Sequence, residues 1–248
     1  MNVVNKLSIL LSLFLALAFA QGSLAAVANP LEFYRPQIEG KNSLKLAKRN
    51  LTDADAVAIA ELLKTNTTVK EVDLSHNKLT DVAVKALADM LKVNSTVEDL
   101  NLSHNKITAA GGKDIAAALK DNKHLLSLEL DENELEDEGC AAFKDAIMVN
   151  ASLQQLELSD NGITDKGLET LLQGLSANRT LTILDISDNL ITDTGAFAVA
   201  QFLKANNTLE ELDMQNNRVG AAGYEAIFAA LKQNTVLRSF KVHFRAPE

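Results

Sequence analysis

Two stretches of the sequence decide the fold, because they repeat each other almost letter for letter. Residues 69–80 read VKEVDLSHNKLT, and residues 97–108, twenty-eight positions later, read VEDLNLSHNKIT. Asparagine keeps this spacing along the chain in two series, the first at Asn66, Asn94, Asn122, Asn150, Asn178, Asn206 and Asn234, and the second at Asn77, Asn105, Asn133, Asn161, Asn189 and Asn217. A register kept over seven units predicts a repeat architecture in which each unit packs on the next.

Each unit predicts one short strand followed by one helix. Apolar and polar residues alternate before each asparagine of the second series, which is the period of a strand. Threonine then stands where a helix N-cap belongs, at Thr80, Thr108, Thr164 and Thr192. A column of glycines falls in the first helical turn, at Gly111, Gly139, Gly167, Gly195 and Gly223. We expect that a side chain there would crowd the neighbouring coil.

The pattern L-x-x-L-x-L-x-x-N, followed by a helical stretch, resembles the leucine-rich repeat family, and the 28-residue unit is similar to that of its ribonuclease-inhibitor-like class. The resemblance covers about residues 42–243. It implies an α/β solenoid, a horseshoe with about eight parallel strands on the concave face and about seven helices on the convex face. We therefore expect one leucine-rich repeat domain at residues 42–248, preceded by a lead-in at residues 29–41.

The resemblance also implies that the second asparagine series (Asn77 to Asn217) forms a ladder that bonds neighbouring backbones. An amide side chain can donate and accept, so it can satisfy the buried N–H and C=O groups of a tight turn. We expect the first series to do the same at the turn from helix to strand, where asparagine tolerates left-handed geometry. The first unit departs from the pattern, with Arg49 at the ladder position, as expected for a terminal unit.

Residues 1–28 are predicted to be a cleaved secretory signal peptide. Lys6 precedes an apolar run at residues 7–20, and small residues at 18–20 and 26–28 offer cleavage sites. The alternative is an uncleaved anchor over residues 7–28. Of the seven N-x-S/T sequons, five fall on the first asparagine series, which argues against glycan sites and favours a bacterial route. We therefore expect an exported protein, secreted or in a bacterial periplasm or envelope, without membrane contact after cleavage.

Composition excludes several classes of function. The net charge of −9 opposes binding to a phosphate backbone, and with aromatic residues at only 4% neither base stacking nor an aromatic cofactor pocket is expected. The single cysteine, Cys140, falls in a core-facing helical column and is read as a small buried hydrophobe. We find no catalytic sequence motif and expect no enzyme and no cofactor.

One column of turn residues has the composition of a possible metal site. His76 and His104 stand 28 positions apart, and Glu132 and Asp160 continue the column. Two imidazoles and two carboxylates in a row could bind a divalent metal. A solvent-facing turn with a freely variable residue explains the same pattern, and we favour it, so no metal site is predicted.

The candidate binding site is the solvent-facing side of the predicted strands, where acidic residues gather. The candidate partner-binding residues are Glu71, Asp73, Asp99, Glu129, Asp131, Glu157, Asp185, Glu211 and Asp213. One interpretation is a merely solvated face, and the other is a docking surface for a basic protein. Because an open sheet lacks an enclosed pocket, we expect no carboxylate on it to have a raised pKa.

The sequence therefore predicts a non-enzymatic protein–protein interaction module, monomeric, that binds a cationic protein through its concave face. Relatives of this repeat class bind protein partners there, which supports the interpretation. The alternative is a regulator of an enzyme, such as a GTPase activator resembling the Ran GTPase-activating proteins, although no functional residue of those proteins can be matched here. The identity of the partner does not follow from the sequence.

Overall fold

The computed structural model describes residues 29–242 of the chain, so the predicted signal peptide at residues 1–28 lies outside the described part. Eight strands alternate with helices: β1 (Ser43–Lys45), β2 (Glu71–Asp73), β3 (Asp99–Asn101), β4 (Ser127–Glu129), β5 (Gln155–Glu157), β6 (Ile183–Asp185), β7 (Glu211–Asp213) and β8 (Ser239–Lys241). The helices are α2 (Pro30–Ile38), α3 (Asp53–Leu63), α4 (Asp81–Leu91), α5 (Ala109–Leu119), α6 (Glu136–Val149), α7 (Asp165–Ala177), α8 (Asp193–Ala205) and α9 (Ala221–Leu231).

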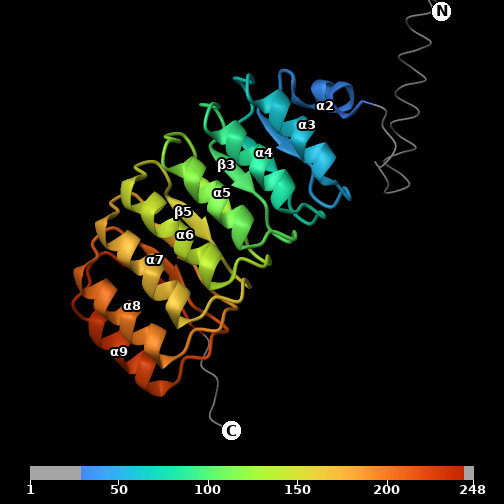
Figure 1. Cartoon of the computed structure of the whole chain (residues 1–248). Helices are drawn as coiled ribbons and strands as arrows, with labels where there is room; N and C mark the ends of the chain where they lie inside the picture. The colour runs from blue at the N-terminus through green and yellow to red at the C-terminus, as the bar shows by residue number, and fades with distance from the viewer. Residues whose placement is uncertain (1–28, 243–248) are drawn as a thin grey trace, which may run out of the picture.

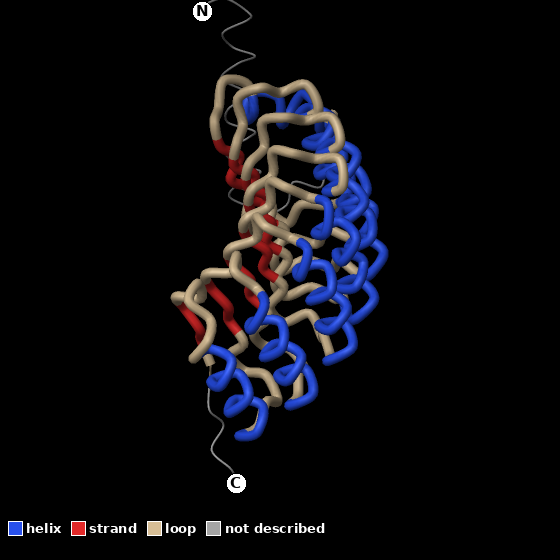
Figure 2. The backbone as a smooth tube through the Cα atoms, turned by 90° about the vertical axis from the view of Figure 1, so that its left-hand side faces the viewer, coloured by secondary structure: helices blue, strands red, loops and turns tan. Residues whose placement is uncertain are grey.

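The molecule is a curved solenoid with two layers. The strands form one parallel sheet in the order β1 to β8, and every partner in the register lies 28 positions away, as Glu129 does from Glu157. The helices lie side by side along the arc (Figure 1), and the strands line the opposite side (Figure 2). The predicted α/β solenoid is confirmed. No helix within residues 29–242 is both long enough and apolar enough to cross a bilayer.

Between the two layers lies a continuous apolar core. The middle residue of each strand faces inward, and Leu100 and Leu128 are at most 1% exposed. The inward residues of the helices, such as Leu87 and Ile115, are fully buried against them. This burial follows directly from the two periodicities of the unit, and it fixes the opposite faces of the strands toward solvent.

The second asparagine series forms a ladder beneath the turns that follow the strands. The Asn133 Nδ2 donates to the carbonyls of Leu102, Leu130 and Asp131 at 3.0–3.1 Å, and its Oδ1 accepts from the Ile107 N–H at 3.0 Å. Comparable bonds recur at Asn77, Asn105, Asn161, Asn189 and Asn217. Each asparagine thus completes the coil that precedes it in the chain.

The first series forms a second ladder where each helix leads into the next strand. The Asn122 Nδ2 donates to the Leu91 carbonyl at 2.7 Å, and its Oδ1 accepts from the Leu125 N–H at 2.8 Å. The expected left-handed geometry is wrong for Asn150 and Asn178, whose φ angles are −70° and −69°. The left-handed residues stand instead just before the other ladder, at Lys48, His76, His104, Glu132, Asp160, Asp188 and Asn216.

A third ladder, which the sequence reasoning missed, joins the first turns of adjacent helices. Asp81 accepts the N–H and the hydroxyl of Thr108 at 2.9 and 2.7 Å and the Gly111 N–H at 3.0 Å. A Cβ at Gly111 would lie 2.6 Å from the Asp81 Oδ1, which explains the glycine column. The third ladder is interrupted at one place. There Ala109 stands where the other units have the aspartate, and Glu136, its expected partner in the next unit, stands where they have the threonine.

The seven helices expected in the repeats are present as α3 to α9, and within the described residues the lead-in at 29–41 adds helix α2, which the sequence reasoning did not predict. Phe33, Tyr34 and Ile38 are buried against the first repeat. The Tyr34 hydroxyl donates to the Asp55 Oδ1 at 3.1 Å, and Asp55 also accepts the Thr52 N–H at 2.8 Å. Burial and the adjacent Asp55 raise the pKa of Tyr34. Helix α2 therefore covers the N-terminal end of the core.

Candidate binding surface

The nine predicted partner-binding carboxylates lie on one face of the sheet, and we call them the acidic strip. Asp131 lies two residues beyond the end of β4, and the other eight occupy solvent-facing positions of β2 to β7. In-register pairing places Glu129 beside Glu157, Glu157 beside Asp185, and Asp185 beside Asp213. Adjacent strands are about 4.8 Å apart, so the strip is a row of like charges at close spacing.

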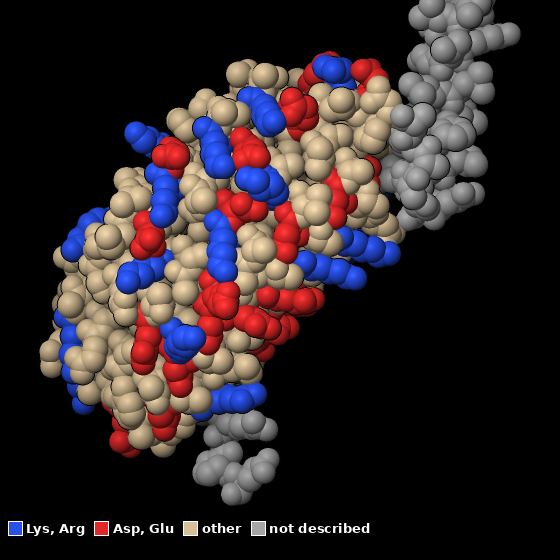
Figure 3. Space-filling view, viewed as in Figure 1, with Lys and Arg blue, Asp and Glu red and all other residues tan. Residues whose placement is uncertain are grey.

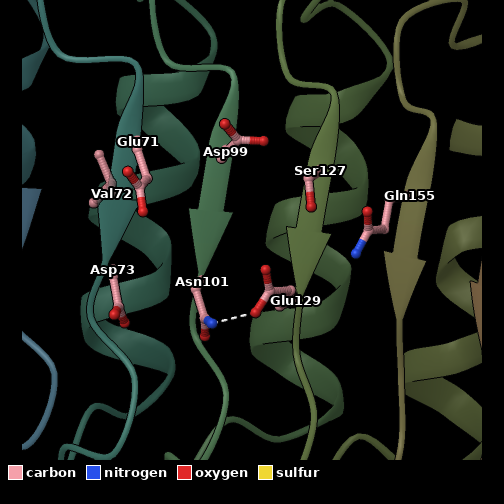
Figure 4. Close-up of a pocket in the computed structure, with 8 residues that line it drawn as sticks. All are labelled: Glu71, Val72, Asp73, Asp99, Asn101, Ser127, Glu129 and Gln155. Carbon is pink, nitrogen blue, oxygen red and sulfur yellow. Dashed lines mark hydrogen bonds between the residues drawn. The ribbon is translucent and has the colours of Figure 1, made fainter. Parts of the chain in front are cut away.

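Two hollows indent this face. The first has a volume of about 270 Å³ and is lined by Glu71, Val72, Asp73, Asp99, Asn101, Ser127, Glu129 and Gln155 (Figure 4). The second has a volume of about 170 Å³ and lies over β5 to β8, where Ile183 adds an apolar side chain among Glu157, Asp185, Glu211 and Asp213. The concave face therefore offers two acidic depressions in line along the sheet.

The carboxylates in the middle of the strip are partly desolvated. Burial, together with the charges of Glu157 and Asp73, raises the pKa of Glu129 to about 7. Burial, with Glu157 and Asp185 beside it, raises the pKa of Asp131 to about 8 against the lowering effect of its bond from the Ser159 N–H. The expectation that no pKa is raised on this open face is therefore wrong, because the curved sheet shields its central side chains from water.

Basic side chains pair with the strip only at its ends. Lys45 contacts Glu71 at 2.8 Å and Lys241 contacts Asp213 at 3.2 Å, and within residues 29–242 no other carboxylate of the strip forms an ion pair. On the helices, by contrast, basic and acidic side chains are intermingled (Figure 3), as where Lys85 contacts Asp89 at 3.3 Å. The middle of the strip thus has no basic counter-charge, and it becomes fully negative only as the pH rises past the pKa values of Glu129 and Asp131.

Neighbouring polar groups hold the central carboxylates in place. The Asn101 amide donates to Glu129, and the Gln155 Nε2 donates to the Glu157 Oε1 at 2.6 Å. The Ser187 N–H donates to the Asp185 Oδ1 at 2.8 Å. The sequence reasoning omitted Asn101 and Gln155 from the site, although both occupy solvent-facing positions of the same strands and could have been found by that register.

The column that was weighed as a metal site forms a different arrangement. The rings of His76 and His104 stack with their centroids 3.7 Å apart and their planes at 18°. The His104 Nδ1 lies 2.5 Å from the Glu132 Oε2. In the described part of the chain, no three His, Cys, Asp or Glu side chains are grouped so that they could hold a metal ion.

Cys140 lies away from this surface, in the core. Its side chain is fully buried, and its Sγ lies 3.6 Å from the Gly167 carbonyl oxygen. Burial and the charge of Asp137 raise the pKa of the thiol to about 12. The thiol is therefore protonated at neutral pH and acts as a small core side chain.

Comparison with known proteins identifies the family to which the repeat belongs. The family model for the Leucine Rich repeat matches six segments, at residues 65–88, 93–116, 121–144, 149–172, 177–200 and 205–228. Among solved structures, the tropomodulin C-terminal domain of Caenorhabditis elegans matches at 13% identity with a TM-score of 0.50, over 73% of this chain and 92% of that one. Leiomodin-1 Actin-Binding Site 2 matches at 22% identity with a TM-score of 0.32, over 83% and 87% of the respective chains. No curated protein matches the sequence.

Proposed function

Because the chain belongs to the leucine-rich repeat family, we propose that it is a protein-interaction module without enzymatic activity, and that its acidic strip binds a basic partner protein. The observation that carries this proposal is the uncompensated middle of the strip. Glu129, Asp131 and Glu157 are held close together with no basic side chain beside them in the described structure.

Bringing like charges together in a partly dry hollow opposes folding, and a lysine or arginine from a partner would relieve that cost. The concentrated field would also speed the encounter with a cationic protein, and salt would weaken it. The strip carries no aromatic anchor of the kind that dominates tight interfaces. We therefore expect fast, salt-sensitive association of modest affinity.

The two hollows suggest the form of the partner segment. They are centred about three strands apart, or roughly 14 Å along the sheet. An extended chain covers this distance in about four residues. A segment that lies across the strands with basic residues at that separation would place one in each hollow, with an apolar residue free to contact Ile183.

A charge-reversal pair tests the proposal. Glu157→Lys with Asp185→Lys reverses the middle of the strip and leaves every buried side chain intact. The matched control, Glu169→Lys with Glu225→Lys, changes the net charge equally but on the exposed faces of α7 and α9.

The measurement is the association rate between the full chain and a partner captured from an extract, as a function of salt concentration. We expect the strip variant to bind about tenfold or more slowly at low salt, and the control variant to bind close to the wild-type rate. If both variants retained the wild-type rate and salt dependence, the acidic strip would be a solvated face and the proposal would be wrong.

We also propose that residues 1–28 direct export of the chain. The support is the sequence pattern alone: a basic residue, an apolar run at residues 7–20 and small residues after it. N-terminal sequencing of the protein recovered from its native source tests this. A first residue at Gln21 or Asn29 is expected, whereas an intact Met1 on an anchored chain would favour the uncleaved alternative.

A further inference from the structure

We propose that the stacked pair His76 and His104 is a pH-sensitive element that weakens binding of a basic partner to the acidic strip when the surroundings become acidic. The inference rests on the proposed function, because it concerns the regulation of the same surface. It differs from that proposal in depending on two residues that are not part of the strip.

The first step in the argument is the position of the pair. His76 follows β2 by three residues and His104 follows β3 by three residues, so the pair stands at the edge of the sheet beside the first hollow, to which Asp73 contributes. Both backbones are held in place, since the His76 N–H donates to the Ser103 carbonyl at 2.9 Å and the His104 N–H donates to the Asp131 carbonyl at 2.8 Å. The backbone of the repeat therefore places the two rings next to each other.

The second step is the charge that this stack can carry. With ring centroids 3.7 Å apart, one imidazolium is tolerated but two repel each other. The Glu132 Oε2 lies 2.5 Å from the His104 Nδ1, so a carboxylate stands beside the His104 ring. A proton on His76 is opposed by its own surroundings.

The groups that face His76 come from four neighbouring segments. Loss of some hydration beside the neighbouring coil, then His104 and Lys48, lower the pKa of the exposed His76, and the more weakly acting Glu132 and Asp73 raise it. The lowering effects prevail, so the pKa of His76 lies below its ordinary value. A neutral His76 leaves the field of the strip unchanged.

The third step links protonation to binding. A cationic His76 is repelled by His104 and attracted by Asp73, so it adds a positive charge at the rim of the first hollow and competes for a carboxylate that a partner would use. Glu129 and Asp131, whose pKa values lie near 7 and 8, are already partly protonated by then. Acidification therefore weakens binding in two separate pH ranges, and only the lower range depends on the histidines.

The test uses His76→Asn, because Asn216 occupies the same column with the same left-handed backbone and shows that asparagine fits there. His124→Asn is the matched control, since it removes an exposed histidine outside the stack. A fluorescent deca-lysine peptide serves as the probe of the full chain, at constant ionic strength and at about pH 8.5, about pH 7 and about pH 5.5.

Between about pH 7 and about pH 5.5 we expect the dissociation constant of the wild type to rise more than that of His76→Asn, by a further factor of about two to five. The His124→Asn variant should follow the wild type, and all three proteins should change alike between about pH 8.5 and about pH 7. Equal losses in the wild type and His76→Asn below pH 7 would overturn the proposal.

A second measurement separates this proposal from the proposed function. Side-chain nitrogen shifts of the unbound protein report the titration of each histidine, and we expect the His76 pKa to rise when His104 is replaced by asparagine. No such rise would overturn the stacked pair as a pH-sensitive element, whatever the strip binds. Failure of deca-lysine to bind the wild type at about pH 8.5 would instead overturn the basic-partner proposal, and with it the regulation inferred here.

Discussion

At the scale of single residues, the central carboxylates of the strip make folding depend on pH. Their pKa values in the folded chain, about 7 for Glu129 and about 8 for Asp131, exceed the ordinary values of 4.5 and 3.8. The folded state therefore holds protons that the unfolded state has already released between those values. The stability they contribute is complete below about pH 4 and is lost as the pH rises through 7 and 8.

Replacing Glu129 by glutamine should therefore change the slope of stability against pH. At about pH 9 we expect Glu129→Gln to unfold with a free energy about 0.5–1 kcal/mol higher than the wild type, because a half-exposed like charge is removed. At about pH 5 the two proteins should be nearly equal. Urea unfolding across this range measures the difference, with Glu169→Gln on α7 as the control that should leave the slope unchanged.

At the scale of the elements, the ladder between helix starts explains where helices begin. In four units a threonine and the aspartate of the previous unit bond each other, as do Thr192 and Asp165 at 2.6 Å. At α9 the threonine is missing, and Gly220 presents only its N–H to Asp193, at 2.6 Å. Its φ of −91° and ψ of −174° resemble those of Thr192, so a threonine needs no special backbone there.

Gly220→Thr should consequently stabilise the protein. The new hydroxyl can reach Asp193 and also cap α9, and the loss of glycine reduces the freedom of the unfolded chain. We expect a gain of about 0.5–1.5 kcal/mol in the free energy of unfolding, measured by thermal or urea denaturation. The gain should shrink when Asp193 is also changed to alanine. A loss of stability in the single variant would show that the Cβ, 3.1 Å from the Asp193 Oδ2, is too crowded.

The elements also show which features the sequence could predict. The 28-residue period fixes the register of the strands. The sequence alone could therefore assign the nine carboxylates of the strip to one face of the sheet and the asparagines of the ladder to the turns after the strands. Helix α2 could not, because its sequence PLEFYRPQI contains an internal proline and belongs to no repeat. The Asp81–Thr108 bond was missed because it joins residues of different units that play different roles within each. The raised pKa of Glu129 depends on how deeply the curved sheet is hollowed, and a residue pattern does not state that depth.

At the scale of the whole molecule, the stability of the solenoid depends on contacts between neighbouring coils. Each repeat contacts the one before and the one after it, so a break at the centre divides the solenoid in two. Asn133 stands at such a place, since its amide makes two hydrogen bonds to the coil of β3, at Leu102 and Ile107, and two within its own coil, at Leu130 and Asp131. The Ala109 position in the same region already lacks the aspartate of the third ladder.

We expect Asn133→Ala to lower the free energy of unfolding by about 2–4 kcal/mol and to make the two halves unfold separately. Hydrogen exchange measures this directly. The Ile107 N–H should exchange faster than in the wild type, and the strands β1–β3 should be protected to a different degree from β5–β8. The control is Asn234→Ala in the last repeat, which should loosen one end and leave a single main transition. A single sharp transition in Asn133→Ala, with uniform protection, would contradict this account.

The direction of the asparagine ladder has a consequence for synthesis on the ribosome. Because Asn105 supplies the amide that closes the turn after β2, the unit holding β2 remains unfinished until the next one has been translated. A growing chain therefore always ends in one open turn, and that turn moves outward by one unit for every 28 residues added. Translation and closure of the turns can therefore advance in the same direction, and the length of chain that follows the last closable turn grows by up to 28 residues and then falls back as each unit is added.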